Sequence, residues 1–286
     1  MAGRDARRSV VSPSGRRERL SGVAETLLLP LYVRALESKR PDALLVDEKA
    51  VAFVAEHEPE IARIKSIRMD EEDRATIILR NRELDRHARA FMARHPRAVV
   101  VHIGCGLDSR FERVDDGQVD WYDLDLAEVI ALRRELLGDE AGRYHLLATS
   151  VFDTAWMGAL SVHRPRPFLF IAEGVLMYFE GQEVRSLVRT LRERFPGSEL
   201  VFDAFLPWLV HANNLRLRLS RSPIEARYRW GLRRGRDLEK WGEGIRLLEE
   251  WFPLDRPEPR LSRVRWMRHI RPLARVLGIY RYQLGN

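Results

Sequence analysis

Apolar residues between Gly22 and about His95 recur at the spacing of amphipathic helices. One such face carries Val23, Leu27, Leu31 and Ala35, and a second pattern carries Val46, Ala50, Phe53 and Val54. A third helix is predicted over about Glu72–Arg94, ending before Pro96. Pro30 falls inside the first pattern, and we expect it to kink that helix or divide it into two short ones. The pattern therefore predicts an all-helical N-terminal cap over residues 21–96.

The pattern changes at Ala98–Ile103, a continuous apolar run that leads into Gly104-Cys105-Gly106. Such a run before glycines is typical of a buried parallel strand that ends in a tight turn. Strands and helices then alternate. The predicted strands are Val119–Leu124, Tyr144–Ala148, Phe168–Ala172 and Glu199–Phe205, and the helices are Ala127–Leu137 and Glu180–Phe195. This alternation predicts an α/β fold with a doubly wound parallel sheet and helices on both faces.

The C-terminal part departs from that alternation. Residues 207–240 have a helical, arginine-rich pattern, and we predict a lid insertion over about 207–243. A last pair of strands is expected near Ile245–Trp251 and Ile279–Leu284, with a helix over about Leu261–Leu277 between them. We therefore divide the chain into a basic, disordered tail over residues 1–20, the helical cap over 21–96, and a sheet domain over 97–286.

Composition excludes several classes of protein. Of the 286 residues, 45% are hydrophobic and 32% are charged, which is typical of a globular chain and excludes fibrous and disordered classes. The single cysteine, Cys105, cannot form an internal disulfide or supply a thiolate zinc site, so we expect a cytoplasmic protein. No apolar stretch reaches the roughly 20 residues that cross a bilayer, and the basic N-terminal segment lacks the apolar core of a secretory signal. We expect no membrane association.

Charge is uneven along the chain. The net charge is +7, of which residues 1–20 contribute +4, residues 21–213 contribute −7 and residues 214–286 contribute +10. A basic end can bind nucleic acid or attract anionic substrates. Here only four of the 49 basic residues are lysine, and the C-terminal arginines are spaced among apolar and acidic residues. Because no nucleic-acid recognition module accompanies them, we expect no nucleic-acid partner.

The glycine turn is the first candidate for ligand binding. Glycines let a backbone approach a ligand closely, but the segment HIGCGLDS has Ser109 where a dinucleotide fingerprint has its third glycine. About 20 residues further, Asp123 and Asp125 stand at the end of the second strand, where a carboxylate can accept both hydroxyls of an adenosine ribose. Asp125 could instead cap the helix that follows. We predict an adenosine-containing ligand.

The fourth strand ends in Ala172-Glu173-Gly174. Ligands of open α/β sheets bind at the carboxyl ends of the strands, so we expect the Glu173 carboxylate to face the same crevice as the glycine turn. An acid at this position could also cap the turn that follows.

Five segments together carry a resemblance to a known family. They are HIGCGLDSR, WYDLDLAEVIALRREL, ATSVFDTAWM, IAEGVLMYF and RWGLRRGRDLEKWGEGIRLLEEW, and ETLLLPLYVRALESKRPDALLVDEKA extends the match toward the N-terminus. The chain resembles the leucine carboxyl methyltransferase superfamily, in particular the bacterial branch that is similar to the tetracenomycin polyketide O-methyltransferase. The resemblance implies a class I S-adenosylmethionine-dependent methyltransferase fold. That fold is a seven-stranded sheet with an antiparallel last strand, together with a helical N-terminal cap.

The resemblance also implies roles for individual residues. The backbone of Gly104 and Gly106 would contact the methionine half of the cofactor, Asp125 the ribose, and Glu173 would lie beside the cofactor. An arginine on the helix before the first strand pairs with the cofactor carboxylate in this family, and Arg80 occupies that place. Where the eukaryotic carboxyl methyltransferases have an Asp-Leu pair that contacts adenine, this chain has Ser150 and Val151, a departure that points to the polyketide-type branch.

The acceptor side is less defined. Tyr32, Tyr178 and Trp208 could line an acceptor pocket, although aromatic residues at such positions are more often part of a core. His211 in the lid and His102 in the first strand are the candidate bases, and we expect a surface position for the former and a core position for the latter. No catalytic residue is assigned and no metal is expected.

We therefore predict an S-adenosylmethionine-dependent O-methyltransferase that acts on a carboxylate or hydroxyl of a small organic or polyketide-type acceptor. A nicotinamide-dependent oxidoreductase and a non-catalytic, basic nucleic-acid-binding protein are the alternatives. The sequence does not indicate whether the protein is a monomer or an oligomer.

Overall fold

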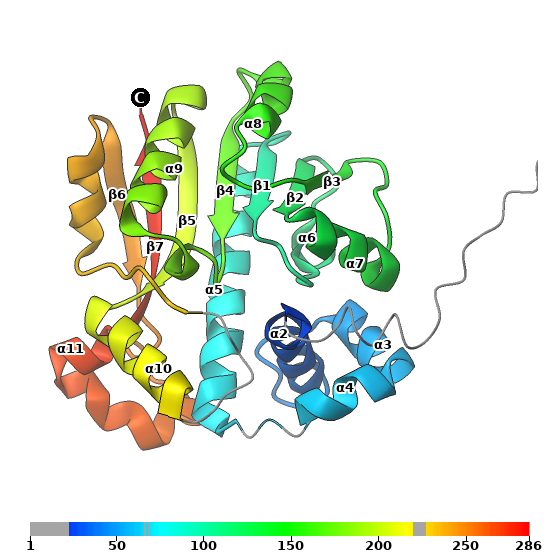
Figure 1. The fold of residues 1–286 in the computed structure, drawn as a ribbon, viewed down its shortest axis with the longest axis vertical. Helices are drawn as coiled ribbons and strands as arrows, with labels where there is room; N and C mark the ends of the chain where they lie inside the picture. The colour runs from blue at the N-terminus through cyan, green and yellow to red at the C-terminus, as the bar shows by residue number, and fades with distance from the viewer. Residues whose placement is uncertain (1–22, 66, 68, 220–226, 286) are drawn as a thin grey trace, which may run out of the picture.

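A seven-stranded sheet forms the centre of the molecule in the computed structural model, which describes residues 23–65, 67, 69–219 and 227–285 (Figure 1). The predicted tail over 1–20 and the lid residues 220–226 lie outside the described residues. The strands are β1 (Val99–Ile103), β2 (Asp120–Asp125), β3 (Tyr144–Ala148), β4 (Phe168–Ala172), β5 (Ser198–Phe205), β6 (Ile245–Trp251) and β7 (Leu277–Leu284). Their order is β3-β2-β1-β4-β5-β7-β6, and β7 runs antiparallel to both neighbours. The predicted sheet with an antiparallel last strand is confirmed.

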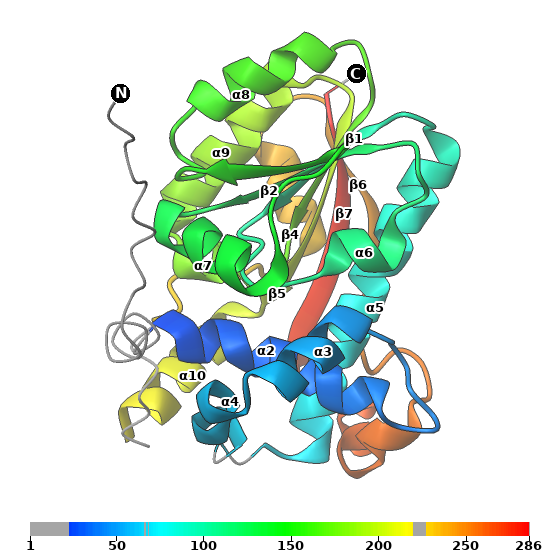
Figure 2. The ribbon, with the colours of Figure 1, turned by 90° about the vertical axis from the view of Figure 1, so that its right-hand side faces the viewer.

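Helices cover both faces of the sheet. One face packs against α5 (Glu71–Arg94), α6 (Arg110–Val114) and α7 (Ala127–Leu137), and the other against α8 (Ala155–Leu160) and α9 (Gly181–Arg194) (Figure 2). β1 and β4 are buried along their whole length, because helices exclude water from both of their faces. These strands read as continuous apolar runs for that reason.

Three helices of the N-terminal cap lie below the carboxyl edge of the sheet: α2 (Val23–Ser38), α3 (Glu48–Glu56) and α4 (Glu58–Lys65) (Figures 1 and 2). Leu28, Leu31 and Phe53 pack there against Leu107 of the loop that follows β1. The division at Pro30 is wrong, since α2 is one helix across that residue. Proline removes only one backbone donor, and burial of the leucines on either side of Pro30 holds the helix together.

The C-terminal region differs more from the prediction. Helix α10 (Pro207–Leu219) ends at Leu219. Within residues 227–244 the structure has only the short 3₁₀ helix η3 (Gly235–Trp241), so the helical pattern predicted as far as residue 240 is wrong for residues 227–234. The strands β6 and β7 are as expected. The single helix predicted over Leu261–Leu277 is wrong. A 3₁₀ segment, η4 (Pro259–His269), and one turn of helix, α11 (Arg271–Ala274), take its place. Pro272 has no amide to continue a helix from η4, and only two residues of η4 are buried, so little packing supports a regular α-helix there.

Candidate active site

The turn after β1 has the backbone geometry that its glycines predict. Gly104 and Gly106 have φ of 64° and 51°, a region that residues with a Cβ atom rarely adopt. The Gly104 amide donates to the Leu124 carbonyl at 2.7 Å, which ties the turn to the end of β2. A Cβ atom on Gly104 would lie 2.3 Å from Cγ2 of Val175, so the turn is also held closely against the segment after β4.

Asp125 lies at this turn, whereas Asp123 does not. The Asp125 carboxylate accepts hydrogen bonds from the amides of Gly106 and Leu126, both at 2.8 Å, and burial raises its pKa. Asp123 is 1% exposed and is bound by Arg133 at 2.6 Å and by the Tyr144 hydroxyl at 2.8 Å. Asp123 and Asp125 are two residues apart and would lie on the same face of a regular strand. Their surroundings differ because β2 ends at Asp125, where the chain turns toward the edge of the sheet. Asp123 therefore stabilises the core between β2 and α7.

A buried charge cluster lies at the end of β4. Glu173 accepts from Arg80 Nε at 2.9 Å and from Asn81 Nδ2 at 2.8 Å through one oxygen, and from Arg110 through the other. Arg80 Nη1 also donates to Asp203 of β5 at 3.1 Å. Burial by itself raises the pKa of Glu173, but the charges of Arg80 and Arg110 outweigh burial and lower it. Both carboxylates and both guanidinium groups are thus held at the edge that carries the glycine turn.

An aromatic pair borders the charge cluster. Tyr178 stacks on Tyr228 with ring centroids 5.3 Å apart, and burial raises the pKa of the Tyr178 phenol. Tyr228 lies near the start of the described segment 227–285, within electrostatic range of Arg80. This edge therefore brings together glycine backbone, the Asp125 carboxylate, side chains of opposite charge and two phenols.

The match to a family model decides the class of protein. The model for leucine carboxyl methyltransferase matches residues 28–192, more than half of the chain. The chain belongs to the leucine carboxyl methyltransferase family.

Similar proteins agree with this family. The chain is 35% identical to the tetracenomycin polyketide synthesis O-methyltransferase TcmP of Streptomyces glaucescens, over 84% of this chain and 86% of that protein. It is 30% identical to the S-adenosyl-L-methionine-dependent methyltransferase dpfgK of Gibberella zeae, over 87% of this chain and 88% of that one. A solved structure from Thermobifida fusca YX has the same fold, with a TM-score of 0.57 and 15% identity over 97% of this chain and all of that chain. The chain is an S-adenosylmethionine-dependent methyltransferase, and the predicted enzyme class is confirmed over the oxidoreductase and the non-catalytic alternatives.

The remaining predicted residues of the methyltransferase lie at different distances from this edge. Ser150 and Val151 follow β3, but Val151 is buried with its carbonyl accepting from Trp156, so only Ser150 has a partly exposed side chain. Trp208 and His211 are exposed on α10, as expected for His211, and Tyr32 packs partly buried within the cap. His102 is a core residue, 1% exposed and beside Arg110 and Asp123.

Sequence reasoning missed Arg110, Asp203 and Tyr228. It also missed two exposed apolar side chains at the carboxyl edge, Leu126 after β2 and Phe152 after β3, which are 47% and 41% exposed. Their signal was present, since each directly follows a predicted contact residue at the end of a strand.

A larger ion network supports the site from below. Arg113 bonds Asp85, Asp47 and Asp108, and the Ser109 hydroxyl donates to Asp47 at 2.6 Å. Ser109, at the place of the missing third glycine, is therefore occupied in holding the cap against the turn. Asp47, at the start of α3, also accepts a hydrogen bond from Arg34 of α2 at 2.8 Å. The Asp47 carboxylate therefore joins α2, α3 and the turn after β1 that carries Ser109.

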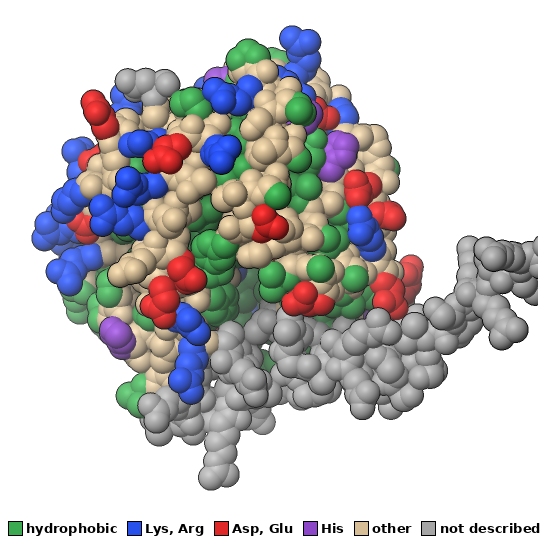
Figure 3. Space-filling model, turned by 45° about the horizontal axis from the view of Figure 1, so that its top comes forward, with side chains coloured by type: hydrophobic (Ala, Val, Ile, Leu, Met, Phe, Trp, Pro, Cys, Tyr) green, Lys and Arg blue, Asp and Glu red, His purple; other side chains and the backbone are tan. Residues whose placement is uncertain are grey.

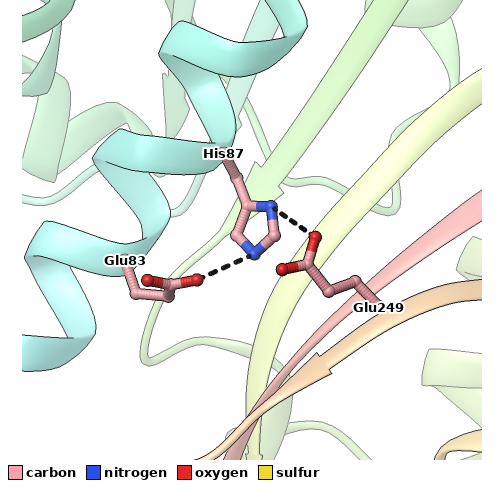
Figure 4. A group of neighbouring side chains, drawn as sticks. All are labelled: Glu83, His87 and Glu249. Atoms are coloured by element: carbon pink, nitrogen blue, oxygen red, sulfur yellow. Dashed lines mark ion pairs between the residues drawn. The ribbon is translucent and has the colours of Figure 1, made fainter.

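A second cluster of ionisable groups joins α5 to the edge strand β6 (Figure 4). His87 lies between Glu83, 3.5 Å from Nε2, and Glu249, 3.9 Å from Nδ1. Arg86 donates to both carboxylates, at 2.6 Å and 2.5 Å, and so occupies the place between them that a cation would take. Burial, and then the charge of Arg86, lower the pKa of His87 to about 4. The cluster thus serves as an electrostatic tie between the two elements.

Arginine and lysine side chains gather on the side of the methyltransferase that carries α9 and η3 (Figure 3). Arg185, Arg189, Arg233, Arg234 and Arg236 are exposed there, and no other described residue forms an ion pair with them. Unpaired exposed arginines give this side a positive field that attracts anions at low ionic strength. Separately, no helix in the described part of the chain has the length and apolar character that crossing a bilayer requires.

Proposed function

We propose that this methyltransferase transfers a methyl group to an oxygen of a small organic acceptor of the polyketide type, and that a carboxylate is the preferred oxygen. Glycine backbone, Arg80, Asp125 and Glu173 would hold the cofactor, with Ser150 and Val151 near its adenine. When bound, S-adenosylmethionine supplies a methyl group on a positively charged sulfur. The chain's own residues bind, orient and exclude water around that group.

The observation that carries the proposal is the unused donor of Arg80. Its Nε and Nη1 bond Glu173 and Asp203, while Nη2 has no hydrogen-bond acceptor among the described residues. A guanidinium held in place by two carboxylates is already oriented, so a carboxylate ligand gains a charge-assisted hydrogen bond at little entropic cost. Glu173 and Asp203, the two acids beside Arg80, suit the ammonium group of the cofactor's methionine part, which also carries that carboxylate. This set of opposite charges fits the methionine end of the cofactor.

The other end of the cofactor fits the apolar residues at the edge. Asp125 would exchange one of its backbone partners for ribose hydroxyls. Leu126 and Phe152, exposed at the ends of β2 and β3, offer apolar surface for the adenine ring. Ser109, bonded to Asp47 where a dinucleotide fingerprint has glycine, supports adenosylmethionine over a nicotinamide cofactor.

The chemistry of the acceptor follows from the absence of a free base among the described residues of this edge. Glu173 and Asp203 are bonded to arginines, and the raised pKa of Tyr178 keeps its phenol protonated. A carboxylate, with an ordinary pKa near 4, is ionised at neutral pH and needs no base. The similarity to TcmP, a polyketide synthesis O-methyltransferase, supports an oxygen acceptor of the polyketide type.

Two measurements test the proposal. Isothermal titration with S-adenosylmethionine, S-adenosylhomocysteine and NADH should give binding of the first two only, and binding of NADH alone would overturn it. Methyl transfer is then followed by mass spectrometry with 1-hydroxy-2-naphthoate, 2-naphthoate and 2-naphthol. We expect methyl esters of the two acids, and methylation of 2-naphthol alone would replace the carboxylate by a hydroxyl.

Arg80 is tested in a background that leaves no unpaired acid. Arg80→Met combined with Asp203→Asn removes the guanidinium without stranding the Asp203 carboxylate, which is fully buried. We expect S-adenosylhomocysteine to bind about tenfold or more weakly, the effect of a lost charge-assisted hydrogen bond. Arg74→Met, at an exposed position of the same helix, is the control. Equal affinities of the two variants would remove Arg80 from the site.

A further inference from the structure

Tyr228 is fixed in place by contacts from two separate elements. Asn214 of α10 donates through Nδ2 to the Tyr228 carbonyl at 2.6 Å, and its Oδ1 accepts from the Tyr228 amide at 2.9 Å. The next amide along the chain, that of Arg229, donates to the Met177 carbonyl at 2.7 Å. A side-chain amide that closes both backbone groups of one residue sets the position of that residue much as a sheet pairing would. The backbone of Tyr228, whose ring is partly buried, is therefore held on both sides.

The ring of Tyr228 reaches the charge cluster rather than the outside of the lid. It stacks on Tyr178 and meets Phe205 at a centroid distance of 5.7 Å. Tyr178 and Tyr228 both lie within electrostatic range of Arg80. Two phenols from different segments thus lie together, next to the arginine that would hold the methionine carboxylate. A short aliphatic chain separates that carboxylate from the reactive sulfur, so the phenols border the place where an acceptor oxygen must come.

We propose that Tyr228, paired with Tyr178 and held by Asn214, positions the acceptor by donating a hydrogen bond to its anionic oxygen and by contacting its aromatic ring. This assignment rests on the proposed function and narrows the acceptor to an aromatic carboxylate. In the step itself, the acceptor oxygen forms a bond to the methyl carbon as the carbon–sulfur bond breaks. The electron pair of that bond stays on sulfur, the negative charge of the acceptor and the positive charge of the sulfonium both disappear, and no proton moves.

Phenols suit this task because they donate without competing for the methyl group. Burial raises the pKa of Tyr178, so this phenol offers a hydroxyl donor and no phenolate nucleophile at neutral pH. Asn214 is a positioning residue in this arrangement, since its side chain hydrogen-bonds the Tyr228 backbone and not the Tyr228 hydroxyl. It makes the place of Tyr228 depend on the docking of α10.

Tyr228→Phe is the decisive variant. Tyr122→Phe is its matched control, because the hydroxyl of Tyr122, on β2, bonds His163, away from the aromatic pair. The affinity of 2-naphthoate for the complex of enzyme and S-adenosylhomocysteine is measured by titration, and KM and kcat are measured with 1-hydroxy-2-naphthoate. We expect Tyr228→Phe to weaken acceptor binding and raise KM about tenfold, with S-adenosylhomocysteine affinity within twofold of the wild type. The control should change none of these.

Asn214→Ala and Asn214→Asp distinguish the role of the two Asn214 hydrogen bonds, which hold the Tyr228 backbone, from the role of the Tyr228 hydroxyl. Asn214→Asp keeps the acceptor for the Tyr228 amide but loses the donor to its carbonyl, so its KM should fall between those of the wild type and Asn214→Ala. An unchanged KM in Tyr228→Phe, or a loss of cofactor affinity equal to the loss of acceptor affinity, would overturn the assignment. If the wild type binds S-adenosylhomocysteine but not 2-naphthoate, the aromatic acceptor class is wrong. If it binds no S-adenosylhomocysteine, the proposed function fails instead.

Discussion

Two acids that stand two residues apart on β2 offer a sharp test, because we assign one to the cofactor and the other to the core. The changes are Asp125→Asn and Asp123→Asn, which are identical in chemistry. We expect the first to weaken S-adenosylmethionine binding with little loss of stability. The second should lower the free energy of unfolding with little change in affinity for the cofactor.

The magnitudes follow from the partners of each carboxylate. Asp123 is 1% exposed and pairs with Arg133 at 2.6 Å, so an amide in its place leaves a buried arginine without its counter-ion. Breaking such a pair costs about 3 to 5 kcal/mol. Asp125 accepts from two backbone amides, and asparagine retains one oxygen to accept from them. Asp125→Asn should instead weaken the contact with the ribose, which lowers the binding free energy of the cofactor by about 1.5 to 3 kcal/mol, or roughly 10- to 150-fold in affinity.

Urea unfolding gives the stability of each variant and isothermal titration its affinity, under the same buffer. The reasoning is refuted if both variants lose affinity equally without loss of stability, because Asp123 would then be a cofactor residue as the sequence suggested. It is also refuted if Asp125→Asn binds the cofactor as the wild type does.

Three further outcomes are expected. Gly104→Ala should destabilise the fold by about 1 to 3 kcal/mol in urea, because its φ is 64° and its Cβ would meet Val175; Val175→Ala should restore part of that loss. The pKa of His87 is about 4 in the fold and near 6.5 when unfolded, so its contribution to stability is lost as pH falls through that window. Between pH 7 and pH 5 the free energy of unfolding of His87→Gln should therefore fall by about 2 kcal/mol less than that of the wild type. An equal fall in the two proteins would show that protonation of His87 is not the cause. With 2-naphthoate, single-turnover rates should be flat from about pH 6 to 9 in the wild type and in His211→Ala, whereas a tenfold rise per pH unit that disappears in His211→Ala would make His211 the base.

The sheet could be predicted from the sequence because each of its strands is defined by local pattern. A continuous apolar run before glycines gives β1, and the same rule gives β4 and places Glu173 at its end. The carboxyl edge then follows from topology alone, which is why the sequence places the glycine turn and Asp125 together at that edge. By contrast, η4 has no regular apolar period, and its fold depends on packing that no local window contains.

The missed ionisable residues Arg110 and Asp203 share one property, which is full burial of a charged side chain. Arg110 directly follows the glycine motif, yet arginine is so often exposed that nothing in the motif marks it as fully buried. Its partner Glu173 lies 63 residues away, and Asp203, which pairs with Arg80, lies 123 residues from it. Ion pairs of such separation exist only once the sheet has formed. Tyr228 has no motif at all, and only the clamp of Asn214 distinguishes it from a surface aromatic residue.

Helix α5 explains how a site built from such distant pairs keeps its geometry. It has 24 residues, and at about 1.5 Å per residue it is long enough to reach both the cofactor edge and the far strand β6. Arg80 and Asn81 bond Glu173 from one part of the helix, while Glu83, Arg86 and His87 tie a later turn to Glu249. The tie to β6 limits the sliding and rotation of α5 against the sheet, since each movement would break ion pairs at the other end. The main effect of the charge network is therefore to fix the orientation of the Arg80 guanidinium, and its net contribution to the stability of the fold is small.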